Sequence, residues 1–194
     1  MAKNTKSVME SFYGTVTPDA NAGVSANTLL PVKASDGAPS KALYLMEFRN
    51  VEVKFSGPTS ARPGFPYINY RLAVVEPDCF ENRGFFSMLY IPLPTDETSA
   101  EDRAKMTVST SRVMGQIDRI LGADSAIEAL GDVSDVASLT EALEALVFDL
   151  EGERIVVEVG IQKPNDKQIA LGYTDSKNSV KQFHAVDSWV SEDN

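Results

Sequence analysis

The spacing of apolar residues changes twice along this chain, and these changes constrain the fold more than any other feature. Residues 42–92 hold segments in which apolar and polar side chains alternate, as they do in β-strands. Residues 98–148 place apolar side chains at helical spacing, and alternation returns over 154–183. The sequence therefore predicts three strands, a helical insert and then further strands.

The three predicted strands before the insert are separated by turn-forming residues. ALYLMEFRNVEVKF (42–55) reverses the sense of its alternation around Glu47 and Phe48, which predicts a bulge or sharp bend. FPYINYRLAVVE (65–76) follows a loop rich in proline and glycine, and GFFSMLYIPL (84–93) ends among prolines. These connections are too short or too poor in helix formers for the crossovers of a parallel sheet.

The helical insert carries its own start and stop signals. Thr98 or Ser99, followed by acidic residues, predicts a capping box, and Gly122 predicts the end of that helix. A second helical stretch is expected near 125–130, and a third from Ser138 with Glu141 as its capping partner.

Two more strands are expected after the insert. GERIVVEVGIQ (152–162) alternates clearly, and IALGYTD (169–175) is predicted as a short strand. NSVKQFHAV (178–186) fits either a last strand or a docked segment. The chain is thus predicted to be mainly β with a helical insert: a five-stranded, OB-fold-like barrel with helices between strands 3 and 4. Other α+β folds with this element order stay open.

The composition divides the chain into three parts. Residues 1–40 are rich in Ala, Ser, Asn, Gly and Pro and predict a partly flexible N-terminal arm. Residues 41–184 form the predicted barrel domain, with the insert at 98–148, and residues 185–194 form an acidic tail. A single cysteine, no long apolar run and no apolar leader favour a reducing, intracellular setting without a membrane span.

The acidity of the chain is concentrated in one place. The net charge is −10, and residues 123–153 contain nine acidic residues and no Lys or Arg. Residues 41–91, by contrast, hold six basic and five acidic residues. A local basic groove is therefore compatible with the predicted strands, whereas a strongly basic surface is not.

Catalytic chemistry has little support in this sequence. One histidine, His184, and one cysteine, Cys79, give no sign of a nucleophile–base pair, and no phosphate loop, zinc helix or nucleophile elbow occurs. Acidic pairs such as Asp132/Asp135 and Glu141/Glu144 fit a solvated helix face better than a metal site. We therefore predict neither an enzyme nor a cofactor.

Aromatic and basic residues interleave in the predicted strands. In the second strand Ile68 and Tyr70 belong to the core set, whereas Tyr67 and Arg71 belong to the opposite set. The third strand is apolar on both sides, so parity does not settle which face Phe86 occupies. Unpaired nucleobases stack on flat side chains while Arg and Lys contact phosphates, which makes single-stranded nucleic acid a candidate ligand.

Three segments of the chain resemble phage-encoded single-stranded DNA-binding proteins of the OB-fold type. They are YLMEFRNVEVKFSG with PYINYRLAVVEP, then NRGFFSMLYIPLP with the helix RVMGQIDRILGA, and finally LEGERIVVEVGIQ with IALGYTDSKNSVKQF. The resemblance implies a protein of the host-cell cytoplasm that coats DNA strands during phage replication or recombination. Its implied DNA face comprises Tyr67, Arg71, Arg83 and Phe86, with Arg49 and Lys54 nearby.

The tail invites a second comparison. Residues 187–194 are acidic and include Trp189, Glu192 and Asp193, similar to the acidic tips through which bacterial single-stranded DNA-binding proteins dock partners. The terminal Pro-Phe of that pattern is missing, so a frayed polar terminus is an equal alternative. A tail of this charge could also compete with DNA by mimicking phosphate.

A rival function fits the same fold. The chain could be a structural or protein-interaction module, such as a virion or assembly component, with the acidic insert as its working surface and all of its aromatics in the core. Oligomeric state, including a homo-oligomer, and the choice between DNA and RNA are left open by the sequence.

Overall fold

The computed structural model describes residues 29–30, 32, 42–76, 78–95, 97–172 and 174–189. Most of the predicted N-terminal arm and the end of the acidic tail lie outside these ranges. The strands are β1 (Ala42–Phe55), β2 (Pro66–Glu76), β3 (Gly84–Leu89), β4 (Arg154–Gln162) and β5 (Lys177–His184). The α-helices are α2 (Ala100–Leu121), α3 (Ser125–Leu130), α4 (Val136–Leu150) and α5 (Asp166–Ala170), and the 3-10 turns are η1 (Asp78–Phe80) and η2 (Val186–Ser188).

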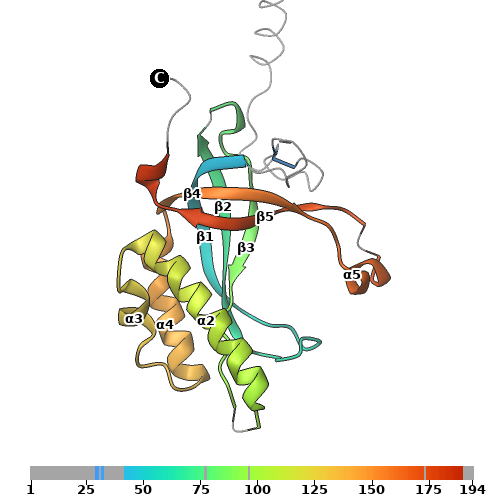
Figure 1. Ribbon diagram of the computed structural model, residues 1–194, viewed down its shortest axis with the longest axis vertical. Coiled ribbons are helices and arrows are strands. Elements are labelled where there is room, and N and C mark those ends of the chain that lie inside the picture. Colours follow the sequence, from blue (N-terminus) through green and yellow to red (C-terminus); the bar gives the residue numbers. More distant parts are fainter. Residues whose placement is uncertain are drawn as a thin grey trace, which may run out of the picture.

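The five strands form one antiparallel sheet in the order β3-β2-β1-β4-β5. β1 is the central strand: its first half pairs with β4, and it pairs with β2 from Leu45 to its end. In Figure 1, β4 and β5 run at a steep angle to β2 and β3. The predicted antiparallel, five-stranded architecture with helices between the third and fourth strands is confirmed.

The irregularity predicted at Glu47 and Phe48 of β1 occurs as two register shifts that flank these residues. The register with β2 shifts between Leu45 and Met46 and again between Arg49 and Glu52. Asn50 has a positive φ of 51°, and the second shift leaves Asn50 and Val51 outside the register with β2. The carboxylate of Glu151 accepts hydrogen bonds from the backbone N–H of Asn50 at 3.2 Å and of Val51 at 2.7 Å. The insert therefore stabilises the bulge from outside the sheet.

The sheet is not closed into a barrel. β3 and β5 approach each other, but no ladder joins them among the described strands. Part of this edge is taken by Leu30, whose N–H donates to Oδ1 of Asn178 in β5 at 2.8 Å. Arg83, just before β3, donates to the carbonyl of Leu29 at 3.0 Å. The predicted barrel would pair β3 directly with β5. At this edge, the side chains of Arg83 and Asn178 instead contact residues 29–30.

The helices α2–α4 lie together on one side of the sheet (Figure 1). Ser99 caps α2 by accepting from the N–H of Asp102, and α2 ends before Gly122, as predicted. The predicted start of the third helix at Ser138 is wrong. Asp135 is the N-cap of α4, and Ser138 is its capping-box partner, because the two exchange side-chain and backbone hydrogen bonds.

The predicted strand over 169–175 is also wrong. Asn165 and Gln168 exchange side-chain-to-backbone hydrogen bonds of 2.9 and 3.0 Å, which start the one-turn helix α5 instead. Gly172 follows with a positive φ of 88°, a conformation that ends the turn. The last strand is β5, so the segment that the sequence left open between strand and docked segment is a strand.

One hydrophobic core lies between the sheet and the helices. The ring of Phe48 sits at its centre, 4.9 Å from the ring of Tyr70 and 6.0 Å from that of Phe183. α4 contributes a buried stripe at helical spacing: Leu139, Leu143, Leu146 and Leu150. Burying such a leucine stabilises the fold by about 1.5–3 kcal/mol, so the insert is part of the domain and not an appendage.

Candidate nucleic-acid interface

The two faces of β2 are separated as predicted at most positions. The core set of Ile68, Tyr70, Leu72 and Val74 is buried. Burial raises the pKa of Tyr70 to about 12, so its hydroxyl stays neutral inside the protein. On the opposite face Tyr67, Asn69 and Arg71 are half-buried, whereas Ala73, the fourth member of that set, is buried.

Strand register brings side chains from β1 and β3 alongside those of β2. Lys54 lies opposite Tyr67, and Arg49, Arg71 and Phe86 form one row across three strands. Met88 lies opposite Asn69. Side chains directly opposite in an antiparallel pair share one face of the sheet. We call this surface the outer face, made of Arg49, Lys54, Tyr67, Arg71, Phe86 and Met88.

The outer face exposes apolar surface next to a hollow. Phe86 is 52% exposed and Met88 is 60% exposed, in contrast to the buried Phe85 beside them in the chain. A hollow of about 490 Å³ is lined by Phe86 and by Asn50, Val51, Glu52 and Lys54 of β1. The bulge in β1 therefore shapes one wall of a concave, partly apolar surface.

Two guanidinium groups meet on the outer face. Arg71 donates to the carbonyl of Asn82 at 2.6 Å, and Arg49 donates to the Asn82 side chain and to Glu47, both at 2.7 Å. Burial first, and then the charge of Arg49, lower the pKa of Arg71. The Nε of Arg71 is buried and has no acceptor within the described part of the chain. An oxyanion bound beside these groups would offset the repulsion between the two cations.

Lys54 forms an exposed ion pair with Glu52. Its ammonium lies 2.8 Å from Glu52, and that hydrogen bond is the main cause that lowers the pKa of Glu52. Exposed pairs of this kind contribute little to stability, so exchanging Glu52 for another anion costs little.

Arg83, predicted for the same interface, lies elsewhere. Its guanidinium donates to Leu29 and stands 5.1 Å from the centre of the Phe80 ring. It shares the strand parity of the buried Phe85 and therefore belongs to the side of β3 opposite Phe86. Sequence reasoning also missed Met88 and Asn82. Met88 shares the parity of Phe86, but parity does not identify a face where both sides of a strand are apolar. Asn82 lies in a turn, where strand parity does not apply.

The tail tryptophan contacts the body of the protein. Trp189 is half-buried, and its indole N–H donates to the carboxylate of Glu76 at 2.6 Å. The side chain predicted to dock a partner thus has an intramolecular partner at the end of β2. Glu192 and Asp193, the other predicted partner residues, lie outside the described residues.

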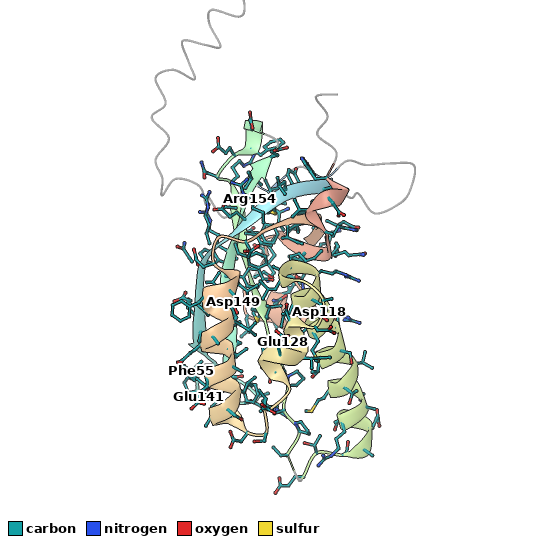
Figure 2. All side chains as sticks on the ribbon, turned by 90° about the vertical axis from the view of Figure 1, so that its left-hand side faces the viewer. Phe55, Asp118, Glu128, Glu141, Asp149 and Arg154 are labelled. Atoms are coloured by element: carbon teal, nitrogen blue, oxygen red, sulfur yellow. The ribbon has the colours of Figure 1, made fainter. Side chains whose placement is uncertain are left out.

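The helical insert presents a different surface. Figure 2 shows Glu128, Glu141 and Asp149 projecting from α3 and α4, with Asp118 of α2 on the same side. Phe148 of α4 is 83% exposed, the most exposed large apolar residue in the ranges described. It lies on the side of α4 opposite the buried leucine stripe, next to Glu141 and Glu144.

The described residues contain no cluster suited to a metal ion and no membrane-spanning helix. No group of three or more His, Cys, Asp or Glu residues among them is placed to hold a metal ion. None of the helices that the structure describes is long and apolar enough to cross a membrane. Comparison with protein-family models, curated proteins and solved structures found no significant match to this chain.

Proposed function

We propose that the chain binds single-stranded DNA on its outer face. The observation that carries this proposal is the row of Arg49, Arg71 and Phe86 across three strands, with the exposed phenyl ring beside the hollow. Bases would stack on Phe86 and Tyr67, at about 1–3 kcal/mol for each base. Such binding makes and breaks no bond of the DNA strand, so the proposed function requires no cofactor.

The cations of the outer face suit the phosphate backbone. The half-buried Arg71 lies opposite Arg49, which is held in a fixed orientation by Asn82 and Glu47. Guanidinium groups recognise phosphate with two parallel hydrogen bonds, whereas Lys54 acts as a point charge. With about three phosphates neutralised, log Kd should change with log salt concentration by a slope of about 2.

We further propose that the fold is an OB-fold left open at one edge. The strand order and the helices between β3 and β4 are those of a five-stranded OB barrel, in which this face of the strands binds oligonucleotides. The contacts of Leu29 and Leu30 with Arg83 and Asn178 provide a reason for the open edge. The biological role that fits is a phage protein which protects or presents strands in replication or recombination, in the host cytoplasm.

A fluorescence-anisotropy titration with labelled oligo-dT at low and moderate salt tests the proposal. Binding should weaken with salt along the shallow slope given above, because so few cations line the face. Phe148→Ala is the control, since it removes an exposed ring from the acidic insert. Absence of binding at low salt would remove the proposal.

A protein-interaction module is the second candidate function, favoured by the exposure of Phe148 among carboxylates. The same titration separates the two functions, because an interaction module with a purely structural outer face would leave the anisotropy of oligo-dT unchanged.

A further inference from the structure

The hollow of the outer face contains a carboxylate beside an aromatic ring. Phe86 lines it with an exposed ring, and Glu52 lines it with a carboxylate. The other lining residues are Asn50, Val51 and Lys54. A carboxylate repels phosphate, so phosphate contacts give Glu52 no role on a surface proposed to bind DNA. Its exposed ion pair with Lys54 contributes little to stability. A base in the hollow is the remaining candidate partner for this carboxylate.

Strand register places the carboxylate one row away from the ring. Phe86 lies opposite Arg71. Glu52 lies opposite Asn69, two residues before Arg71 in β2. Rows two residues apart are separated by about 7 Å along a strand, and both side chains line the same hollow. A base stacked on Phe86 would therefore have an edge within reach of Glu52.

The carboxylate of Glu52 has acceptor capacity to spare. The Nζ of Lys54 lies 2.8 Å from its Oε1, and the side-chain amide of Asn69 donates to the same oxygen at 3.3 Å. Within the residues that the structure describes, Oε2 accepts no hydrogen bond. The hydrogen bond from Lys54 lowers the pKa of Glu52, so this group is ionised near neutral pH and acts only as an acceptor. If Lys54 turns to a phosphate, Oε1 is released as well.

The four DNA bases differ in the donors that they offer to a carboxylate. Guanine presents its N1–H and its 2-amino group side by side on the Watson–Crick edge, which fits the two oxygens of one carboxylate. Adenine and cytosine each present one amino group next to a ring nitrogen that accepts. Thymine presents a single N–H between two carbonyl oxygens, which a carboxylate repels. Paired hydrogen bonds to an ionised group are the strong ones, so guanine is the best match.

We propose that the hollow is a guanine subsite, in which the base stacks on Phe86 and Glu52 accepts hydrogen bonds from its N1–H and 2-amino group. This inference rests on the proposed function, because it assigns a base preference to the same outer face. Thymine is then a poor ligand for this one position, although oligo-dT still binds through the other rings and cations. A strand with guanine should bind about fivefold more tightly, the low end for a bidentate contact, because Glu52 is exposed.

Anisotropy titrations at low salt with four labelled strands of equal length test the subsite. One strand is oligo-dT, and in the others every fourth thymine is replaced by guanine, adenine or hypoxanthine. Adenine matches the stacking surface of guanine, and hypoxanthine lacks only the 2-amino group. The variant is Glu52→Gln, whose amide has a single acceptor oxygen. Glu144→Gln is the control, because it removes the same charge from an exposed position on α4. Circular dichroism should confirm that both variants fold like the wild type.

The wild-type protein should bind the guanine strand about fivefold more tightly than the adenine strand or oligo-dT. The hypoxanthine strand should lose most of this gain. Glu52→Gln should abolish the preference for guanine, whereas Glu144→Gln should keep it.

Two kinds of failure are distinguishable. Equal affinities for the guanine and adenine strands, or a preference for guanine that survives in Glu52→Gln, would overturn the subsite while DNA binding itself still stood. Absence of binding by all four strands would overturn the proposed function, and the subsite with it.

Discussion

The outer face of the sheet and the outward side of α4 both expose a phenylalanine, yet they present opposite electrostatic surroundings. Phe86 lies in a row with Arg49 and Arg71, whereas Phe148 lies among Glu141 and Glu144. The proposed function therefore requires that a polyanion bind beside the first ring and avoid the second. An exposed ring therefore indicates a binding surface only together with the charges beside it.

The two regions also differ in how they are supported. The hollow of the outer face is lined by the bulge residues Asn50 and Val51, whose backbone N–H groups donate to Glu151, the C-cap of α4. On α4, the buried leucine stripe lies on the side of the helix opposite Phe148 and packs in the core. Helix α4 thus stabilises the shape of the outer face through Glu151. Its outward side chains, in contrast, carry a charge opposite to that of Arg49 and Arg71. The predictions below separate these two contributions.

The largest expected effect concerns stability. Leu146→Ala should lower the free energy of unfolding by about 2–5 kcal/mol, because it opens a cavity between α4 and the sheet. Phe148→Ala, two residues away on the exposed side, should change it by no more than about 0.5 kcal/mol. Urea denaturation followed by circular dichroism measures both. Similar losses for the two variants would show that Phe148 is packed in solution.

Next in size is the effect of removing a ring from the outer face. If each ring carries a stacked base, as proposed, Phe86→Ala or Tyr67→Ala should weaken oligo-dT binding by about 1–3 kcal/mol. Phe148→Ala should leave the affinity unchanged. Anisotropy titrations at one fixed salt concentration give the comparison. If all three variants bound like the wild type, base stacking on this face would be excluded.

The salt dependence should distinguish rings from cations. Tyr67→Ala should cost more affinity than Arg71→Ala at high salt, because stacking survives screening and phosphate contacts do not. Arg71→Ala should also reduce the slope of log Kd against log salt by about 0.7. Titrations over a series of salt concentrations provide both numbers. The reverse order of losses at high salt would contradict a stacking mechanism.

A smaller effect should be confined to the insert. Asp135→Ala removes the N-cap of α4 and should lower stability modestly, without altering oligo-dT affinity. Hydrogen bonding from Ser138 lowers the pKa of Asp135, so the ionised form is favoured in the folded state. Its contribution is present above the unfolded pKa and is lost as pH falls through the lower folded value. Denaturation midpoints of wild type and variant should therefore converge as the solution is acidified.

The smallest effect should come from the tail. Trp189 is bonded to Glu76, five residues beyond Arg71 in β2, a separation of about 17 Å along a strand. Screening acts over about 10 Å at 0.1 M salt, so Asp187→Asn, a change next to this anchor, should alter oligo-dT affinity by less than about twofold. A tenfold gain at that salt concentration would show that the tail reaches the outer face. The emission of Trp189, the single tryptophan, should stay constant on DNA binding.

The sequence predicted the elements whose own residues determine them. Alternation identified β1, β2 and β4, and an apolar run that ends among prolines identified β3. The cap at Thr98 or Ser99 and the stop at Gly122 marked the ends of α2, because capping is local. α5 was missed since its apolar residues resemble a short strand, and the hydrogen bonds of Asn165 and Gln168 decide against it. The open edge of the sheet was not predictable, because it involves Leu30 and Asn178, 148 positions apart.

The candidate site was predicted in part for the same reason. Parity in β2 placed Tyr67 and Arg71 correctly, because Ile68 and Leu72 mark the core face. Arg83 was included only because the family resemblance implies it, and its guanidinium instead contacts Leu29 and the Phe80 ring. The engagement of Arg49 and Arg71 with Asn82 depends on the geometry of a turn with a positive φ of 61° at Asn82, which residue spacing does not reveal.

Photocrosslinking with an oligo-dT strand that carries 5-iododeoxyuridine tests the central claim most directly. Adduct formation requires a base held against a side chain, and mass spectrometry of the digest identifies that side chain. Base stacking on the outer face predicts adducts at Tyr67 or Phe86 and none at Phe148. Adducts confined to the helical insert or to the connection between β4 and β5, with Tyr67 and Phe86 unmodified, would contradict the account.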